Sequence, residues 1–222
     1  MYKRGVITDE VSQDLDVIIG VMRRYGVQGA EIRTIWNTRV DLLIPRQVRA
    51  LRDRLASEEL VVPALATPFY KCDVGDAQAH REHLDILRRS IDVALELGVA
   101  MLRTFTFWRK EPIPSWDPIV DAYQEPARLA HAAGVTLAIE NEGSCYVGTG
   151  AELDEFLTAL DLPHVRGIWD PGNAVAEPGF PDGYERAKRW CPHVHLKDLR
   201  IESDGTAVSV LLGDGSLDVR GQ

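Results

Sequence analysis

Apolar side chains recur three and four positions apart in several stretches of the chain, and three of these stretches end at a glycine. The first stretch, between residues 15 and 25, has one apolar face, and Ser12 or Asp14 could cap the helix that this spacing predicts. Gly26, Gly98 and Gly134 follow the three stretches, and glycine favours the left-handed conformation that commonly ends a helix. A short run containing β-branched residues follows each glycine. The pattern therefore predicts repeated helix-to-strand junctions.

Seven short runs are predicted as strands, separated by helical or mixed segments: Gly5–Thr8, Ala30–Arg33, Leu60–Thr67, Leu102–Phe107, Thr136–Glu140, Val165–Asp170 and His193–Asp198. Alternation of strands and helices indicates a parallel sheet, either doubly wound or closed into a barrel. A nucleotide-binding sheet carries a glycine-rich loop after its first strand, whereas this chain continues Thr8-Asp9-Glu10-Val11-Ser12. Polar residues also follow many different strands, as in a (β/α) barrel. We therefore expect one domain with an α/β barrel.

The composition is that of a folded globular protein. Of the 222 residues, 45% are hydrophobic, and 34 acidic against 25 basic side chains give a net charge of −9. No apolar run approaches the length of a membrane span, and the acidic balance argues against a nucleic-acid or membrane surface. The three cysteines lack a Cys-x-x-Cys spacing, which suits reduced thiols rather than a thiolate zinc site. We therefore expect a cytoplasmic protein without a nucleic-acid or membrane partner.

Three candidate metal ligands stand at the ends of three successive predicted strands. They are Glu140, Asp170 and His195. Two carboxylates and one imidazole suit Mn²⁺ or Mg²⁺ and can accept Co²⁺ or Zn²⁺. Side chains alternate along a strand, so Val194 and Leu196 are expected to face the covering helices and His195 to face inward. The same alternation places Glu140 on the inward face.

Further polar and aromatic side chains near the strand ends are candidate substrate contacts. They are Lys71, Trp108, Arg109, Glu177 and Lys197. Lys197 could hold a substrate oxyanion or be solvated at the rim, and Lys71 and Arg109 could equally be ordinary surface charges. The Trp108 ring could form a wall of the pocket.

The segments Ala138–Glu142, Trp169–Ala174 and His193–Asp198, in this order and at this spacing, resemble the sugar phosphate isomerase/epimerase family. Two shorter motifs also look like that family, Glu31-Ile32-Arg33 and Gly213-Asp214-Gly215. The resemblance covers essentially the whole chain. It implies a xylose isomerase-like (β/α)8 TIM barrel and a metal-dependent isomerase or epimerase of a small sugar, keto-sugar or sugar phosphate.

The resemblance also implies roles for particular residues. In that family a Glu, an Asp and a His on strands five, six and seven and a second Glu on strand eight hold the metal, which assigns the first three positions to Glu140, Asp170 and His195. Glu140 is then expected to be one catalytic base. Asn173 stands where the family often has a histidine, and we expect it to contact either the substrate or the residues that hold the metal. The implied chemistry is proton transfer by a carboxylate through a metal-stabilised ene-diolate.

The glutamate of strand eight has no equivalent after Asp198. The runs Leu199–Ile201 and Val208–Leu212 are predicted to form a hairpin, because a parallel crossover needs a dozen or more residues. Asp214 and Asp218 are possible substitutes for the missing ligand. Eight units of the spacing found here would need roughly 250 residues. We therefore expect a single barrel domain that is incomplete at its C-terminus and lacks the eighth βα unit.

Other functions remain open on the sequence alone. An inosose-type dehydratase would use the same scaffold and metal, and a non-catalytic ligand-binding descendant would account for the missing glutamate. Apurinic endonucleases share this barrel, but their three-metal cluster uses many histidines, whereas this chain has 6 histidines and a charge of −9. We expect a small-molecule carbohydrate partner and a homo-oligomer.

Overall fold

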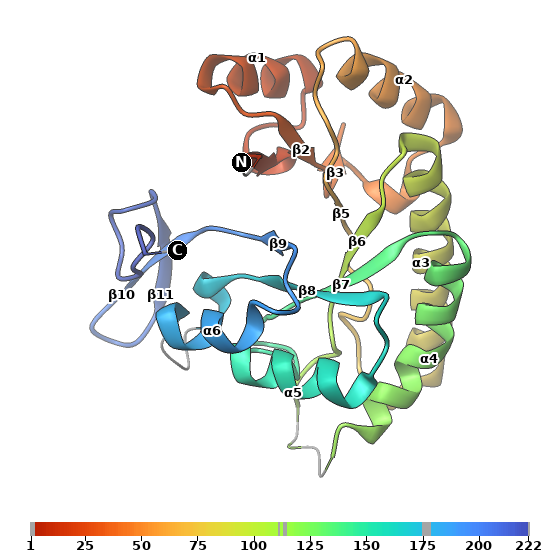
Figure 1. Ribbon diagram of the computed structural model, residues 1–222. Helices are drawn as coiled ribbons and strands as arrows, with labels where there is room; N and C mark the ends of the chain where they lie inside the picture. The colour runs from red at the N-terminus through yellow and green to blue at the C-terminus, as the bar shows by residue number, and fades with distance from the viewer. Residues whose placement is uncertain (1–2, 111, 113–114, 175–178, 222) are drawn as a thin grey trace. The chain divides into compact units, whose positions relative to one another are not determined.

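The computed structural model describes residues 3–110, 112, 115–174 and 179–221, and it divides the chain into two compact units (Figure 1). The first unit comprises residues 1–69, 77–104 and 128–137, and the second comprises residues 70–76, 105–127 and 138–222. None of the described helices combines the length and the apolar composition that a transmembrane helix requires.

The first unit contains parallel strand pairs flanked by helices. Its elements are β1 (Gly5–Ile7), α1 (Leu15–Tyr25), β2 (Gly29–Glu31), β3 (Thr34–Ile35), β4 (Thr38–Arg39), α2 (Pro45–Ala56), β5 (Leu65–Ala66), α3 (Ala77–Leu97) and β6 (Met101–Thr104). Strand β1 pairs in parallel with β2, and β5 pairs in parallel with β6. The N–H of Thr136, the first residue of β7 (Thr136–Glu140), donates to Ala100 at 2.8 Å, so β7 begins beside β6.

Helix α1 shows why the predicted junctions form. The Asp14 side chain caps the helix by accepting hydrogen bonds from Asp16 N and Val17 N at 2.9 and 3.3 Å. Gly26 ends it in the left-handed region with φ of 62°. Gly98 and Gly134 have φ of 69° and 72°, which confirms the prediction for all three glycines.

The second unit contains parallel strands and helices of its own. Its elements are α4 (Asp117–Ala132, whose last residues belong to the first unit), the end of β7, α5 (Gly150–Leu160), β8 (Val165–Trp169), α6 (Tyr184–Ala187), β9 (His193–Val194), β10 (Asp198–Ile201) and β11 (Ala207–Val210). The strand order here is β7-β8-β9, with β8 and β9 parallel. The core of this unit includes stacked rings of Tyr70 and Phe107, with Tyr123 at their edge and Phe156 beyond it.

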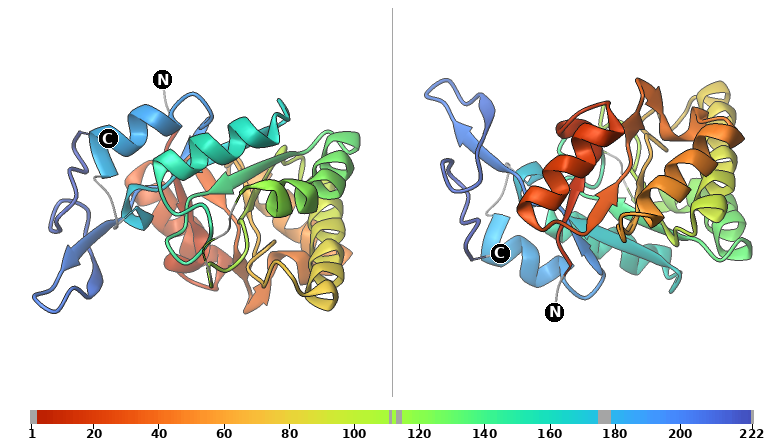
Figure 2. Two further views of the ribbon diagram at one scale, coloured as in Figure 1. Left: turned by 90° about the horizontal axis from the view of Figure 1, so that it is seen from below. Right: turned by 90° about the horizontal axis from the view of Figure 1, so that it is seen from above.

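The predicted strands and hairpin are present, most of them with different bounds. A strand overlaps each of the seven predicted runs, and the predicted C-terminal hairpin is the antiparallel pair β10 and β11, drawn in dark blue in Figures 1 and 2. In both figures this hairpin extends away from α5 of the same unit. The run His193–Asp198 is not one strand, because β9 ends at Val194 and Asp198 begins β10. The hairpin β3–β4, which turns through Trp36 and Asn37 at φ of 54° and 56°, was not expected.

The prediction for Val194 and Leu196 is wrong. Both side chains are exposed, at 39% and 48%, rather than covered by helices. His195 between them is buried, at 9% exposure. Side chains therefore alternate along this segment as predicted, with His195 buried and its two neighbours on the opposite face. Among the described residues, no helix buries Val194 or Leu196.

The first unit contains a buried carboxylate, Asp41, that is held by two arginines. The Asp41 side chain is fully buried and accepts hydrogen bonds from Arg39, and from Arg89 of α3 at 2.9 Å. Burial by itself would raise the pKa of Asp41, but these two guanidinium groups outweigh it and lower the pKa.

We predict that Asp41→Asn lowers the free energy of unfolding by about 2 kcal/mol, because it leaves two half-buried arginines without their anion. Since the pKa of Asp41 is lowered in the folded chain, its stabilisation is full above the unfolded pKa and disappears as the pH falls through the folded value. Urea unfolding at pH 7 and at acidic pH measures both effects. Asp85→Asn, in an exposed pair with Arg88, is the matched control and should change stability by less than about 0.5 kcal/mol. Equal losses in the two variants would contradict the prediction.

Candidate metal centre

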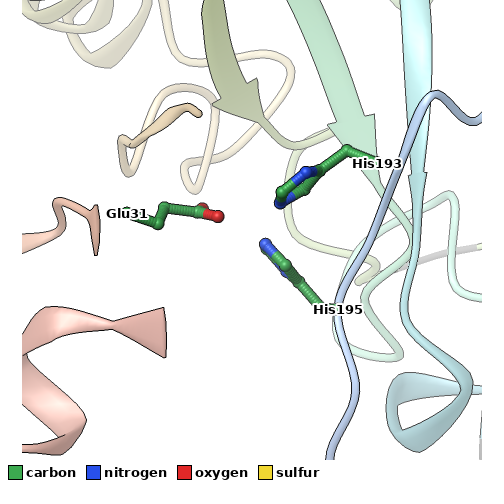
Figure 3. Close-up of side chains that lie close together, drawn as sticks. All are labelled: Glu31, His193 and His195. Atoms are coloured by element: carbon green, nitrogen blue, oxygen red, sulfur yellow. The ribbon is translucent and has the colours of Figure 1, made fainter. Parts of the chain in front are cut away.

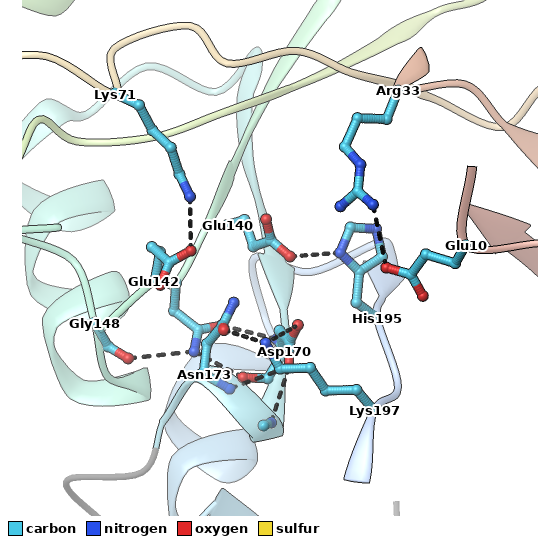
Figure 4. Close-up of polar contacts among 12 residues, drawn as sticks. Glu10, Arg33, Lys71, Glu140, Glu142, Gly148, Asp170, Asn173, His195 and Lys197 are labelled. Carbon is cyan, nitrogen blue, oxygen red and sulfur yellow. Dashed lines mark hydrogen bonds and ion pairs between the residues drawn. The ribbon is translucent and has the colours of Figure 1, made fainter. Parts of the chain in front are cut away.

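Three side chains of the second unit converge from the ends of neighbouring strands (Figure 4). Glu140 is the last residue of β7, Asp170 directly follows β8, and His195 directly follows β9. One ligand atom from each lies within 4.8 Å of the others. Their exposed fractions are 4%, 4% and 9%. The carboxyl ends of adjacent parallel strands thus bring together the three residues that the sequence predicts as ligands.

His195 is held by both its backbone and its ring. Its N–H donates to Trp169 O at 2.9 Å, which extends the pairing of β9 with β8, and its Nδ1 lies 2.6 Å from Glu140 Oε1. The rings of His193 and His195 meet edge to face, with centroids 5.1 Å apart and planes at 86° (Figure 3). These contacts fix the direction in which the imidazole of His195 presents its nitrogens.

Asp170 is held in a turn that begins after β8. Its Oδ1 accepts from Gly172 N at 2.8 Å and from Asn173 N at 3.2 Å, and Lys197 Nζ lies 3.6 Å from Oδ2. The pKa of Asp170 is raised to about 6, because burial and, to a smaller extent, Glu140 outweigh the opposite effects of Lys197, His195 and the Asn173 N–H. Two carboxylates in a buried site therefore oppose each other's ionisation.

Asn141 links the two strand ends that carry the carboxylates. Its Oδ1 accepts from Asp170 N at 2.8 Å, and its Nδ2 donates to Asp170 O at 2.8 Å and to Gly148 O at 3.3 Å. The side chain is fully buried. Because both ends of the amide are bonded, the backbone of Asp170 is fixed relative to the end of β7.

The donor set fits a divalent cation. Carboxylate oxygens and an imidazole nitrogen bind Mn²⁺, Mg²⁺, Co²⁺ and Zn²⁺ at about 2.0–2.2 Å, so ligand atoms around one ion lie within about 4.5 Å of one another. The spacing of Glu140, Asp170 and His195 is close to this requirement. Their assignment as ligands stays a prediction.

Lys71 belongs to an ion pair beside this cluster. Its Nζ lies 2.8 Å from Glu142 Oε2, 4.2 Å from the centroid of the Phe105 ring and 5.4 Å from that of Trp108. The structure thus brings Lys71 and Trp108 together near the end of β7, and their assignment as substrate contacts stays a prediction. Glu142, two residues beyond Glu140, was not singled out, although strand alternation placed both on one face.

The remaining predicted substrate contacts have different surroundings. Lys197 donates to Asn173 Oδ1, so these two lie together next to Asp170. Arg109 is tied to the loop after β7, because it donates to Cys145 O at 3.0 Å and Tyr146 O at 2.6 Å and pairs with Glu152. These bonds indicate that Arg109 holds this loop. Glu177 lies outside the described residues.

The chain was compared with known families and curated proteins. A family model described as xylose isomerase-like TIM barrel matches residues 19–221. Inosose dehydratase of Klebsiella pneumoniae (strain 342) is 28% identical over an alignment that covers 47% of this chain and 41% of that protein. The chain therefore matches less than half the length of this curated relative.

Solved structures share the fold across almost the whole chain. The IOLI protein with a binding zinc atom has a TM-score of 0.81 and 18% identity, covering 99% of this chain and 82% of that chain. L-ribulose 3-epimerase has a TM-score of 0.75 and 18% identity, covering 98% of this chain and 74% of that chain. Together with the family model, these likenesses confirm the predicted xylose isomerase-like TIM barrel fold and the family resemblance.

We predict that Asn141→Ala lowers the free energy of unfolding by at least about 2 kcal/mol, because it leaves the buried N–H and C=O of Asp170 without their partner. It should also weaken Mn²⁺ binding, measured by calorimetry, since the backbone of Asp170 is no longer fixed. Gln78→Ala removes an exposed amide of α3 that is bonded to Glu82 and serves as the control. Unchanged stability of the Asn141 variant in urea would show that the amide does not hold the two strand ends.

Proposed function

Because the chain belongs to the xylose isomerase-like TIM barrel family, we propose that it is a metal-dependent isomerase or epimerase of a small sugar, keto-sugar or sugar phosphate. The observation that carries this proposal is the convergence of Glu140, Asp170 and His195 at the ends of three neighbouring strands. The likeness to L-ribulose 3-epimerase supports the same reaction class. A carbohydrate substrate, a homo-oligomeric state and a cytoplasmic location belong to this proposal.

The buried donor set would hold the metal through one oxygen of each carboxylate and a ring nitrogen of His195. Mn²⁺ or Mg²⁺ suits two carboxylates and one imidazole best, and Co²⁺ or Zn²⁺ is compatible. When bound, such a cation would polarise a substrate carbonyl and an adjacent hydroxyl and stabilise an ene-diolate. The likeness to a zinc-binding protein of the same fold supports metal binding by this chain.

Glu140 is the proposed base. Its carboxylate is fixed by the 2.6 Å contact with His195 Nδ1 and by its position at the end of β7, so it meets a bound substrate in one orientation. Glu140 would take the proton from the hydroxyl-bearing carbon next to the carbonyl and return it to the former carbonyl carbon, while the hydroxyl proton passes to the former carbonyl oxygen, which isomerises the sugar. Epimerisation returns a proton to the same carbon from the opposite face and requires a second base.

Lys197, Asn173, Lys71 and Trp108 are proposed to contact the substrate. Lys197 and Asn173 lie beside Asp170 and together offer an ammonium and an amide to substrate oxygens. Lys71 and Trp108 lie close together, and Lys71 pairs with Glu142. The indole ring and the ion pair could both contact a bound sugar. Arg109 is proposed to act mainly through the loop that it holds.

A dehydratase is the second candidate. The match to inosose dehydratase favours it, because elimination of water begins with the same removal of a proton next to a carbonyl. The two reactions differ in what leaves the substrate. Proton NMR in D₂O separates them, since solvent deuterium enters at carbon in both cases but a hydroxyl is lost only in dehydration.

We predict that Glu140→Gln lowers the rate of deuterium exchange by about 10²–10⁴-fold, measured on a ketose or inosose that the wild-type chain converts. The glutamine keeps the shape of the glutamate side chain but cannot act as a base. Asp170→Asn and His195→Ala should each weaken Mn²⁺ binding by at least about tenfold. Glu185→Gln, an exposed carboxylate of α6 paired with Lys188, is the control and should leave both quantities unchanged. Full-strength Mn²⁺ binding in all three site variants would place the metal elsewhere.

A further inference from the structure

We infer that the substrate of the Glu140–Asp170–His195 centre is an uncharged polyhydroxy carbonyl compound, and that Glu142 excludes phosphorylated substrates by neutralising Lys71. This inference rests on the proposed function, because it specifies the substrate class of the same site. It concerns the charges that surround the three candidate ligands rather than the ligands themselves.

The Lys71–Glu142 pair lies beside the candidate metal centre. Glu142 is two residues beyond Glu140, and successive residues of an extended chain advance by about 3.3 Å, so the pair is within reach of a sugar bound at Glu140. Figure 4 shows Lys71 directed toward Glu142 and not toward Glu140. The exposed fractions of the two side chains, 27% for Lys71 and 23% for Glu142, make their mutual attraction stronger than that of a surface pair.

The backbone and two rings hold this pair in place. Glu142 N donates to Val147 O at 2.8 Å and Glu142 O accepts from Cys145 N at 2.7 Å, which closes a tight loop around the glutamate. The Lys71 ammonium lies over the Phe105 and Trp108 rings, which favour a cation through their electron-rich faces. Lys71 is thereby held close to Glu142.

The other cations of the proposed site are also matched by polar or acidic groups. Lys197 donates to Asn173 and lies 3.6 Å from Asp170, and Arg109 pairs with Glu152 at 2.6 Å. A phosphoryl group is recognised by lysine or arginine that can turn its charge toward the anion. A paired lysine and glutamate instead offer a donor and an acceptor side by side, which suits the hydroxyl groups of a neutral sugar.

The test is to release Lys71 and measure anion binding. We expect Glu142→Gln to bind inorganic phosphate and fructose 6-phosphate at least about tenfold more tightly than the wild-type chain, because the ammonium is then free to meet an anion. Calorimetry and the shift of the thermal midpoint measure this, with and without Mg²⁺. The double variant Lys71→Met with Glu142→Gln is the matched control and should lose the gain.

The outcomes separate this inference from the proposed function. A folded Glu142→Gln variant that binds phosphate no better than wild type overturns the inference, as does a gain that survives in the double variant. The wild-type chain gives an independent result: saturable phosphate binding that Lys71→Met weakens also overturns it, and no such binding supports it. Failure of the proposed function would appear instead as absence of Mn²⁺ or Mg²⁺ binding. The difference in phosphate affinity between Glu142→Gln and the wild-type chain can still be measured in metal-free protein.

Discussion

The side-chain amide of Asn141 joins the ends of β7 and β8, and the geometry of the candidate centre depends on this interaction. Its oxygen and nitrogen bond the N–H and C=O of Asp170, while Glu140 is its neighbour in the chain. The two carboxylates are therefore positioned by backbone held in a fixed register rather than by flexible side chains. The additional bond to Gly148 connects the same amide to the loop that leads into α5.

This arrangement concentrates negative charge where water is excluded. Burial and the proximity of Glu140 raise the pKa of Asp170 to about 6, although Lys197, His195 and a backbone N–H oppose the shift. A group of buried carboxylates that remains difficult to ionise despite these partners is electrostatically suited to a cation. The same reasoning explains why the site combines strand ends from three parts of the sequence: a single loop would not bury two carboxylates and an imidazole together.

The sequence predicted those features that depend on short-range patterns. Gly26 as a helix end and Asp14 as a cap follow from local backbone sterics and hydrogen bonding, and alternation along strands indicated that Glu140 and His195 face inward. The function of Asn141 could not be predicted in this way, because its partners are carried by β8 and a distant loop position. The pairing of Lys71 with Glu142 joins residues 71 positions apart, so the sequence showed two charges but not their mutual neutralisation.

Asp198 shows how the segment that carries His195 and Lys197 is connected to the C-terminal hairpin. Burial by itself would raise the pKa of Asp198, but backbone N–H groups of Gly215, Gly213 and two leucines donate to its carboxylate and lower the pKa. Gly213 adopts φ of 95°, and a Cβ at Gly215 would collide with the Asp198 carboxylate, so this binding loop requires glycine at both positions. The Gly-Asp-Gly motif therefore has a structural function: with the two leucine N–H groups it encloses the carboxylate that begins β10, and these hydrogen bonds tie the C-terminal segment to the start of the hairpin.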